Sequence, residues 1–144
     1  MDSPLSLDTD IDEIVENFSF LDDWEDRYGY LIELGNALTA VTEDEMSDAN
    51  KVQGCVSQVW LVSTYDQGKL YFRGTSDAHI VRGLVAVALS IFSGKTPEEV
   101  AQLDEQQTFH AIGLAEHLTP QRSNGLKSLV GKIKATSQAA MAQT

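Results

Sequence analysis

The sequence predicts an α+β fold in which a small antiparallel β-sheet packs against several α-helices. Apolar residues recur at helical spacing over residues 11–38, and two β-branched segments flank an Asp-Gln-Gly turn at residues 66–68. A long apolar stretch follows at residues 80–92. The order of helices, hairpin and further helices is typical of α+β proteins rather than of repeated βαβ units.

Two helices are expected in the N-terminal part of the chain. Ser6 or Asp8 can cap the first one, because short polar side chains accept hydrogen bonds from the free N–H groups of a first turn. Its apolar positions are Ile11, Ile14, Val15 and Phe18. The second helix is expected to begin at Asp22 or Asp23 and to present one broad apolar stripe. The stripe consists of Trp24, Tyr28, Leu31, Ile32, Leu34 and Leu38. Residues 42–51 are polar and non-periodic, which predicts a loop.

A β-hairpin is expected in the middle of the chain. Residues 56–64 are rich in β-branched and aromatic side chains, which favours a strand, and residues 69–74 form the return strand. Gly68 supplies a positive φ to the turn between them. Because a two-stranded ribbon is only marginally stable by itself, a further strand or a helix must pack against it.

A buried central helix is expected after the hairpin. Ser76 is a good N-cap and Gly94 a good residue to follow the helix end, and the residues between them are apolar nearly all round. A proline and a capping box mark the start of the next helix, which runs to about Leu103, and they are formed by Thr96, Pro97 and Glu99.

The C-terminal part predicts two more helices. One covers residues 105–116, and "LTPQRSNG" then breaks the pattern. The last helix is expected to begin near Ser123, with the apolar positions Leu126, Leu129, Val130 and Ile133. We expect one domain over residues 1–144, with its core at about 10–135 and a flexible C-terminal tail at about 136–144 that has little to bury.

Composition excludes several classes of function. The net charge of −12 argues against nucleic acids and anionic membranes, whose binding needs a basic surface. One cysteine cannot form an internal disulfide, which fits a reducing compartment. The first residues are acidic where a signal peptide needs a basic segment, and no apolar stretch is long enough to span a bilayer. The expected location is the cytoplasm.

The charge is unevenly distributed. Residues 1–50 contain 15 Asp and Glu side chains and one basic residue, Arg27, whereas the chain from Leu118 onward contains four basic residues and no acidic one. The acidic part is either a solvated face that keeps the protein soluble or a docking surface for a basic partner.

Metal and phosphate chemistry have weak support. The histidines are His79, His110 and His117, and no CxxC or HExxH spacing occurs. His110 and His117 could share a helix face, although such surface pairs are far commoner than metal sites. No Walker or GxGxxG spacing is present, and residues 74–76 are better explained as a strand-to-helix junction than as an anion site. The residues predict neither a metal nor a cofactor.

Cys55 is the remaining candidate for chemistry. It follows Gly54 where a polar loop turns into a strand, and a helix N-terminus or a cation such as Arg122 would lower its thiol pKa. Free cysteines are, however, among the residues most often buried in cores. The residues alone therefore leave a reactive and a structural cysteine equally open.

Three segments resemble the SufE/CsdE family of sulfur-acceptor proteins. They are "GCVSQVWL", "GTSDAHIVRGLVAVAL" and "LTPQRSNGL", which occur in the family's order and spacing. The resemblance covers about Asp10 to Ala135, and Val56 departs from the polar residue, often Gln, of some members. It implies an α+β, SufE/IscU-like fold with the cysteine on a loop at the edge of the sheet.

The resemblance also implies a function. Family members are not enzymes themselves: they accept persulfide sulfur from a PLP-dependent cysteine desulfurase (SufS/CsdA-like) and stimulate it. They then pass the sulfur to an iron–sulfur scaffold complex (SufBCD-like). Cys55 matches the family's persulfide acceptor, and PLP would stay on the partner, so this chain needs no cofactor.

Three supporting residues follow from the same motifs. Arg122 would stabilise a thiolate or persulfide anion, or only hydrogen-bond loop carbonyls. Asp77 would favour the dipole at a helix N-terminus, and His79 could act as a base if it reaches Cys55. The alternative functions are a Cys-dependent hydrolase or peroxidase that pairs Cys55 with a histidine, and an interaction module in which Cys55 is inert.

Overall fold

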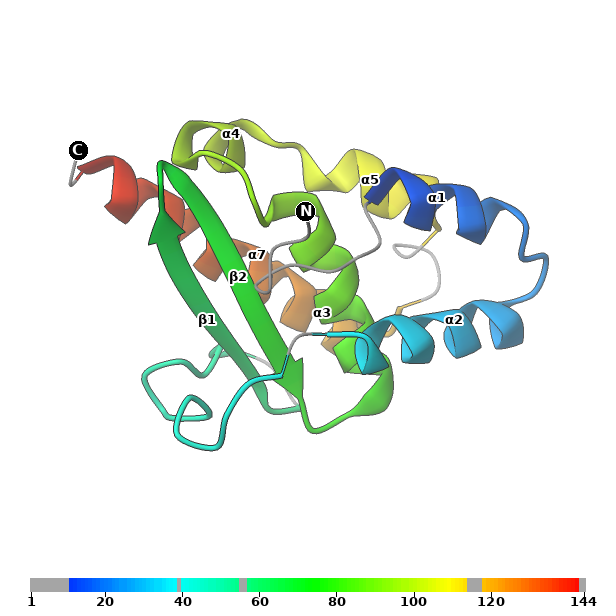
Figure 1. Cartoon of the computed structure of the whole chain (residues 1–144). Helices are drawn as coiled ribbons and strands as arrows, with labels where there is room; N and C mark the ends of the chain where they lie inside the picture. Colours follow the sequence, from blue (N-terminus) through cyan, green and yellow to red (C-terminus); the bar gives the residue numbers. More distant parts are fainter. Residues whose placement is uncertain (1–10, 39, 55–56, 114–117, 143–144) are drawn as a thin grey trace.

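The computed structural model describes residues 11–38, 40–54, 57–113 and 118–142 (Figure 1). The described elements are α1 (Ile11–Ser19), α2 (Trp24–Asn36), β1 (Val59–Asp66), β2 (Lys69–Ser76), α3 (His79–Phe92), α4 (Pro97–Gln102), α5 (Glu105–Ala111) and α7 (Pro120–Ala142). The predicted α+β class is confirmed: β1 and β2 form an antiparallel sheet that packs against helices. In the described part of the chain, no helix is both long and apolar enough to cross a membrane.

Helix α3 is the centre of the fold. It lies between the β-hairpin and α2, and α7 packs against it and against β1 (Figure 1). Every residue from Gly83 to Leu89 is buried, as are Ile91 and Phe92. This agrees with the predicted all-round apolar helix and supplies the support that the ribbon needs.

Helices α2 and α3 approach closely because of a glycine. A Cβ atom at Gly83 would lie 2.2 Å from the Leu31 carbonyl oxygen, much closer than any real Cβ contact. Leu31 is itself fully buried in the core. Only a residue without a side chain allows the two backbones to pack at this distance.

The predicted hairpin turn is present, and a second residue in it also has a positive φ. Gln67 and Gly68 both have positive φ, 51° and 81°, as a type I′ turn requires. The strands pair in register from Val59 opposite Ser76 to Asp66 opposite Lys69. The first strand was predicted to begin at Val56, but β1 begins at Val59.

The N-terminal helices follow the prediction. Helix α1 contains the expected apolar residues, while its predicted caps Ser6 and Asp8 lie outside the described residues. Asp23 caps α2, and its carboxylate accepts a hydrogen bond from the Asp26 N–H (2.8 Å). Both features of the capping box at Thr96 and Glu99 are present at the start of α4.

Three helix boundaries were predicted incorrectly. Ser76 does not cap α3: it is the last residue of β2, and Ala78 is the N-cap. The helix predicted for residues 105–116 ends at Ala111, followed by Gly113 with φ 75°, whereas residues 114–117 lie outside the described residues. The last helix begins at Pro120 instead of Ser123.

The C-terminal residues bury more than expected. We expected those beyond Lys134 to have little to bury. Helix α7 instead continues through Ala142, and Ser137 and Ala140 are buried with relative exposures of 0% and 7%.

Candidate functional site

A short antiparallel pairing encloses the segment that contains Cys55. Lys51 pairs with Trp60, and the Val52 N–H donates to the Val59 carbonyl (2.8 Å). Residues 53–58 therefore connect two extended segments that are hydrogen-bonded to each other. Residues 42–51 were predicted to be a loop, and this pairing of Lys51 is a difference from that prediction. Cys55 and Val56 themselves lie outside the described residues.

Gly54, the residue before Cys55, lies against helix α7. Its φ is +89°, and a Cβ atom there would lie 2.7 Å from the Ser128 Oγ. A side chain at this position would therefore be strained in its backbone, and the Ser128 hydroxyl would have to move aside. The backbone just before Cys55 thus passes close to α7.

The C-terminal end of the segment is held by Asp77 and Ser76. The Asp77 carboxylate accepts hydrogen bonds from the Gln58 backbone N–H (3.1 Å) and from the Gln58 side-chain amide (3.3 Å). The buried Ser76 hydroxyl donates to the Gln58 carbonyl (2.7 Å) and accepts from the Ala78 N–H (3.2 Å). These bonds between residues far apart in sequence draw Gln58 toward the junction of β2 and α3.

Arg122 lies in a stretch that was expected to break the helical pattern. Thr119 stands before Pro120 and accepts a hydrogen bond from the Arg122 backbone N–H at its Oγ1 (3.3 Å), so residues 119–122 start α7. The Arg122 side chain lines a cavity of about 320 Å³. Its walls also include Ser57, Val59, Val81, Leu84, Val85, Thr119, Gln121, Gly125, Leu126 and Leu129. Arg122 and Ser57, which follows Cys55 by two positions, thus share one cavity with mostly apolar walls.

The histidines are not gathered at this cavity in the described structure. His79 is exposed at the start of α3, where its Nδ1 lies 3.4 Å from the Nη2 of Arg82 on the same helix. His110 is exposed on α5, and His117 lies outside the described residues. Among the described residues, no three His, Cys, Asp or Glu side chains gather as possible metal ligands.

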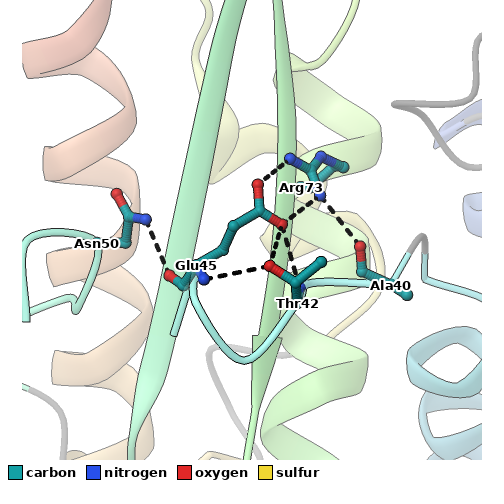
Figure 2. Close-up of polar contacts among 5 residues, drawn as sticks. All are labelled: Ala40, Thr42, Glu45, Asn50 and Arg73. Atoms are coloured by element: carbon teal, nitrogen blue, oxygen red, sulfur yellow. Dashed lines mark hydrogen bonds and ion pairs between the residues drawn. The ribbon is translucent and has the colours of Figure 1, made fainter. Parts of the chain in front are cut away.

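An ion pair anchors the loop that leads toward Cys55. Arg73 on β2 pairs with Glu45 through both guanidinium Nη atoms, one of which also donates to the Ala40 carbonyl (3.1 Å) (Figure 2). Thr42 donates to the same carboxylate, and Asn50 donates to the Glu45 carbonyl (2.9 Å). The hydrogen bonds from Arg73, followed by those from Thr42, lower the pKa of Glu45 from 4.5 to about 2.

Several residues that contact the Cys55 segment or the residues leading into it were not predicted from the sequence. Gln58, Ser128 and the Glu45–Arg73 pair were not singled out, nor was Lys132, which hydrogen-bonds the strand before Cys55. Each acts on a residue distant in the chain, and none belongs to a local motif. Only the start of α7 had a local signal, Thr119-Pro120, which repeats the Thr96-Pro97 helix start.

Comparison with known proteins identifies the family. Residues 12–137 match the family model described as SufE, the Fe-S metabolism associated domain. The chain is 52% identical over 135 residues to an uncharacterized SufE-like protein of Rhizobium meliloti (strain 1021), covering 90% of this chain and 96% of that protein. It is 54% identical over 129 residues to an uncharacterized SufE-like protein of Rhizobium etli, covering 86% of each.

The fold has a counterpart among solved structures. The solution structure of a hypothetical protein from Thermus thermophilus matches with a TM-score of 0.74, 20% identity and 99% coverage of both chains. At this identity the likeness shows the fold alone. The family match and the two bacterial relatives carry the assignment: this chain belongs to the SufE family and has a role in iron–sulfur metabolism.

Proposed function

We propose that this protein is a sulfur acceptor and carrier that takes persulfide sulfur from a PLP-dependent cysteine desulfurase onto Cys55. The Cys55 thiolate attacks the terminal sulfur of the partner's persulfide, the partner's S–S bond breaks, and its cysteine leaves as a thiolate. Cys55 then carries the new S–S bond. The sulfur passes on to an iron–sulfur scaffold complex, and the protein acts as an accessory activator of the desulfurase rather than as an enzyme.

The main structural support is the way residues on both sides of Cys55 are held. Gly54 lies on α7, Gln58 is bound by Asp77, and Ser57 lines a cavity with Arg122. Hydrogen bonds at Val52 and Gln58 thus hold the described residues before and after the proposed acceptor. The family assignment supports the chemistry, because it connects the chain to iron–sulfur metabolism.

In this proposal Arg122 supplies positive charge to the Cys55 thiolate or persulfide. A guanidinium remains protonated at every physiological pH, and the mostly apolar walls of its cavity would strengthen its attraction for an anion. Asp77 acts through Gln58 by fixing the end of the segment. The reducing cytoplasm is the expected setting, because it keeps a lone cysteine as a thiol.

The competing hydrolase or peroxidase function receives no support from the described contacts. It needs a histidine within hydrogen-bond reach of the Cys55 thiol. The described contact of His79 is to Arg82 on its own helix, His110 is exposed on α5, and Cys55 and His117 lie outside the described residues.

Intact-protein mass spectrometry separates the alternatives. The protein is incubated with a cysteine desulfurase and free cysteine, and in a parallel sample with a model ester. Gain of one sulfur atom on Cys55 is expected. An acyl adduct on Cys55 without sulfur uptake would support a hydrolase, and an unmodified Cys55 in both samples would support an inert cysteine.

A further inference from the structure

Lys132, near the middle of α7, hydrogen-bonds the turn and bridge residues that lead into the Cys55 segment, residues 53–58. Its Nζ donates hydrogen bonds to the carbonyl oxygens of Ala49 (3.3 Å) and Lys51 (3.2 Å). The side chain is half-buried, and burial lowers the pKa of its ammonium group. A half-buried ammonium group that donates to two carbonyls is held in place more firmly than an ammonium group in open solvent.

The two carbonyls lie beside the bridge that Lys51 forms with Trp60 of β1. The Asn50 carbonyl accepts from the Leu61 N–H (2.8 Å), and the Val52 N–H donates to Val59, so these groups face β1. The carbonyl of Lys51 itself points away from β1, because the Asn50 carbonyl and the Val52 N–H take the bonds to β1. Ala49 lies in the turn just before this bridge, and Lys132 binds both carbonyls.

The same face of α7 contacts the segment again one turn earlier. Ser128 is four positions before Lys132, a spacing that places both side chains on one helix face. The Ser128 Oγ is the atom that a Cβ at Gly54 would meet at 2.7 Å. Helix α7 therefore contacts the strand before Cys55 through Lys132 and the adjoining residue Gly54 through Ser128.

We propose that Lys132 is a positioning residue for sulfur transfer: it anchors residues 49–51, which lead into the Cys55 segment, to α7. This inference rests on the proposed function of Cys55. Lys132 itself contacts only backbone carbonyls, so it acts through the strand and not on the reacting sulfur. Without it, residues 49–52 keep their turn hydrogen bonds and their pairing with β1 but lose their attachment to α7, so they should open more often.

Amide hydrogen exchange tests the anchor without reference to sulfur chemistry. In Lys132→Met, the protection of the Val52 and Leu61 amides should fall by about tenfold, as expected for loss of one or two hydrogen bonds. The Leu70 amide, which donates to the Lys95 carbonyl on the other edge of the sheet, should be unchanged and reports global stability. Lys127→Met is the matched control, because Lys127 is exposed on the same helix.

Transfer kinetics then test the positioning role. The maximal rate of sulfur uptake by Lys132→Met should fall about five- to tenfold, the effect expected when about one hydrogen bond that orients Cys55 in the transition state is lost, while the half-saturating concentration stays within about twofold. Lys132→Arg should retain the wild-type amide protection and the wild-type maximal rate, since a guanidinium can also donate to two carbonyls. Lys127→Met should behave as wild type.

Failure of this inference differs from failure of the proposed function. A wild-type protein that takes up no sulfur overturns the proposed function. A wild-type protein that takes up sulfur at the same maximal rate as Lys132→Met overturns the role of Lys132 alone. Equal loss of protection at Val52, Leu61 and Leu70 would also overturn it, because the change would then be a global destabilisation.

Discussion

The Asp77 carboxylate binds Gln58 twice, through its backbone N–H at 3.1 Å and its side-chain amide at 3.3 Å. These residues are 19 positions apart, and the hydrogen bonds join the junction of β2 and α3 to the end of the Cys55 segment. From the motif, Asp77 was expected to favour the dipole at a helix N-terminus. In the structure it hydrogen-bonds Gln58, which follows the proposed acceptor Cys55 by three positions.

Replacement of Asp77 should destabilise the fold measurably. Asp77→Ala removes both bonds to Gln58 and should lower the free energy of unfolding in urea by about 1 kcal/mol. Asp44→Ala, at an exposed carboxylate in the loop before Lys51, should change it by less than about 0.5 kcal/mol. Equal effects of the two substitutions would mean that the Gln58 contacts add nothing to stability.

The Glu45–Arg73 pair should make stability depend on acid pH. Because hydrogen bonds from Arg73 depress the pKa of Glu45 from 4.5 to about 2, folding favours the ionised carboxylate. Its stabilisation is complete above pH 4.5 and is lost as the pH falls toward 2. Glu45→Gln should therefore have a lower melting temperature than wild type at pH 7, and the two curves should converge on acidification. Glu43→Gln is the matched control, and a Glu45→Gln difference that persists at about pH 2 would contradict this account.

The α2–α3 contact should not tolerate a side chain at Gly83. Gly83→Ala would place a Cβ atom 2.2 Å from the Leu31 carbonyl. The helices must move apart, at a cost of about 1–3 kcal/mol in unfolding free energy. Gly131→Ala on α7 has no heavy atom within 4 Å of the new Cβ, so it should stabilise the protein by about 0.5–1 kcal/mol through helix propensity. A stable Gly83→Ala protein would show that the helices are less tightly packed than described.

The acidic N-terminal region should steer a partner by charge. The carboxylates of α1 and α2 at Asp12, Glu13, Glu16, Glu25, Asp26 and Glu33 are all exposed. If they attract a basic partner, activation of the desulfurase should weaken as salt is raised, because screening at physiological ionic strength acts over about 8 Å. Association rates that do not change with salt would leave these residues with a role in solubility.

Local patterns predicted most of the fold. The capping box at Thr96 and the turn at Gly68 depend on neighbouring residues, so the sequence identified them correctly. The same Thr-Pro start was missed at Thr119, because Asn124 and Gly125 made the segment resemble a break. Ser76 was assigned to α3 as a cap, whereas its hydroxyl bonds Gln58, which local sequence could not reveal.

The candidate site was predictable only in part. The family motifs pointed to Arg122 and Asp77, and both lie among the residues that surround the ends of the Cys55 segment. The anchors supplied by Lys132 and Ser128 depend on how α7 crosses the strand before the segment. Such contacts are set by tertiary packing and have no sequence period. The roles of Cys55, Arg122, Asp77 and His79 in sulfur transfer remain predictions.

Mass spectrometry of wild-type and Cys55→Ser proteins after incubation with a cysteine desulfurase and free cysteine shows whether Cys55 accepts sulfur. Far-UV circular dichroism on the same samples checks that both are folded. Wild type should gain one sulfur atom, removable by a reductant, and Cys55→Ser should gain none while keeping its helical spectrum. A folded Cys55→Ser protein that still acquires covalent sulfur, or a wild-type protein that acquires none, would contradict the proposed function.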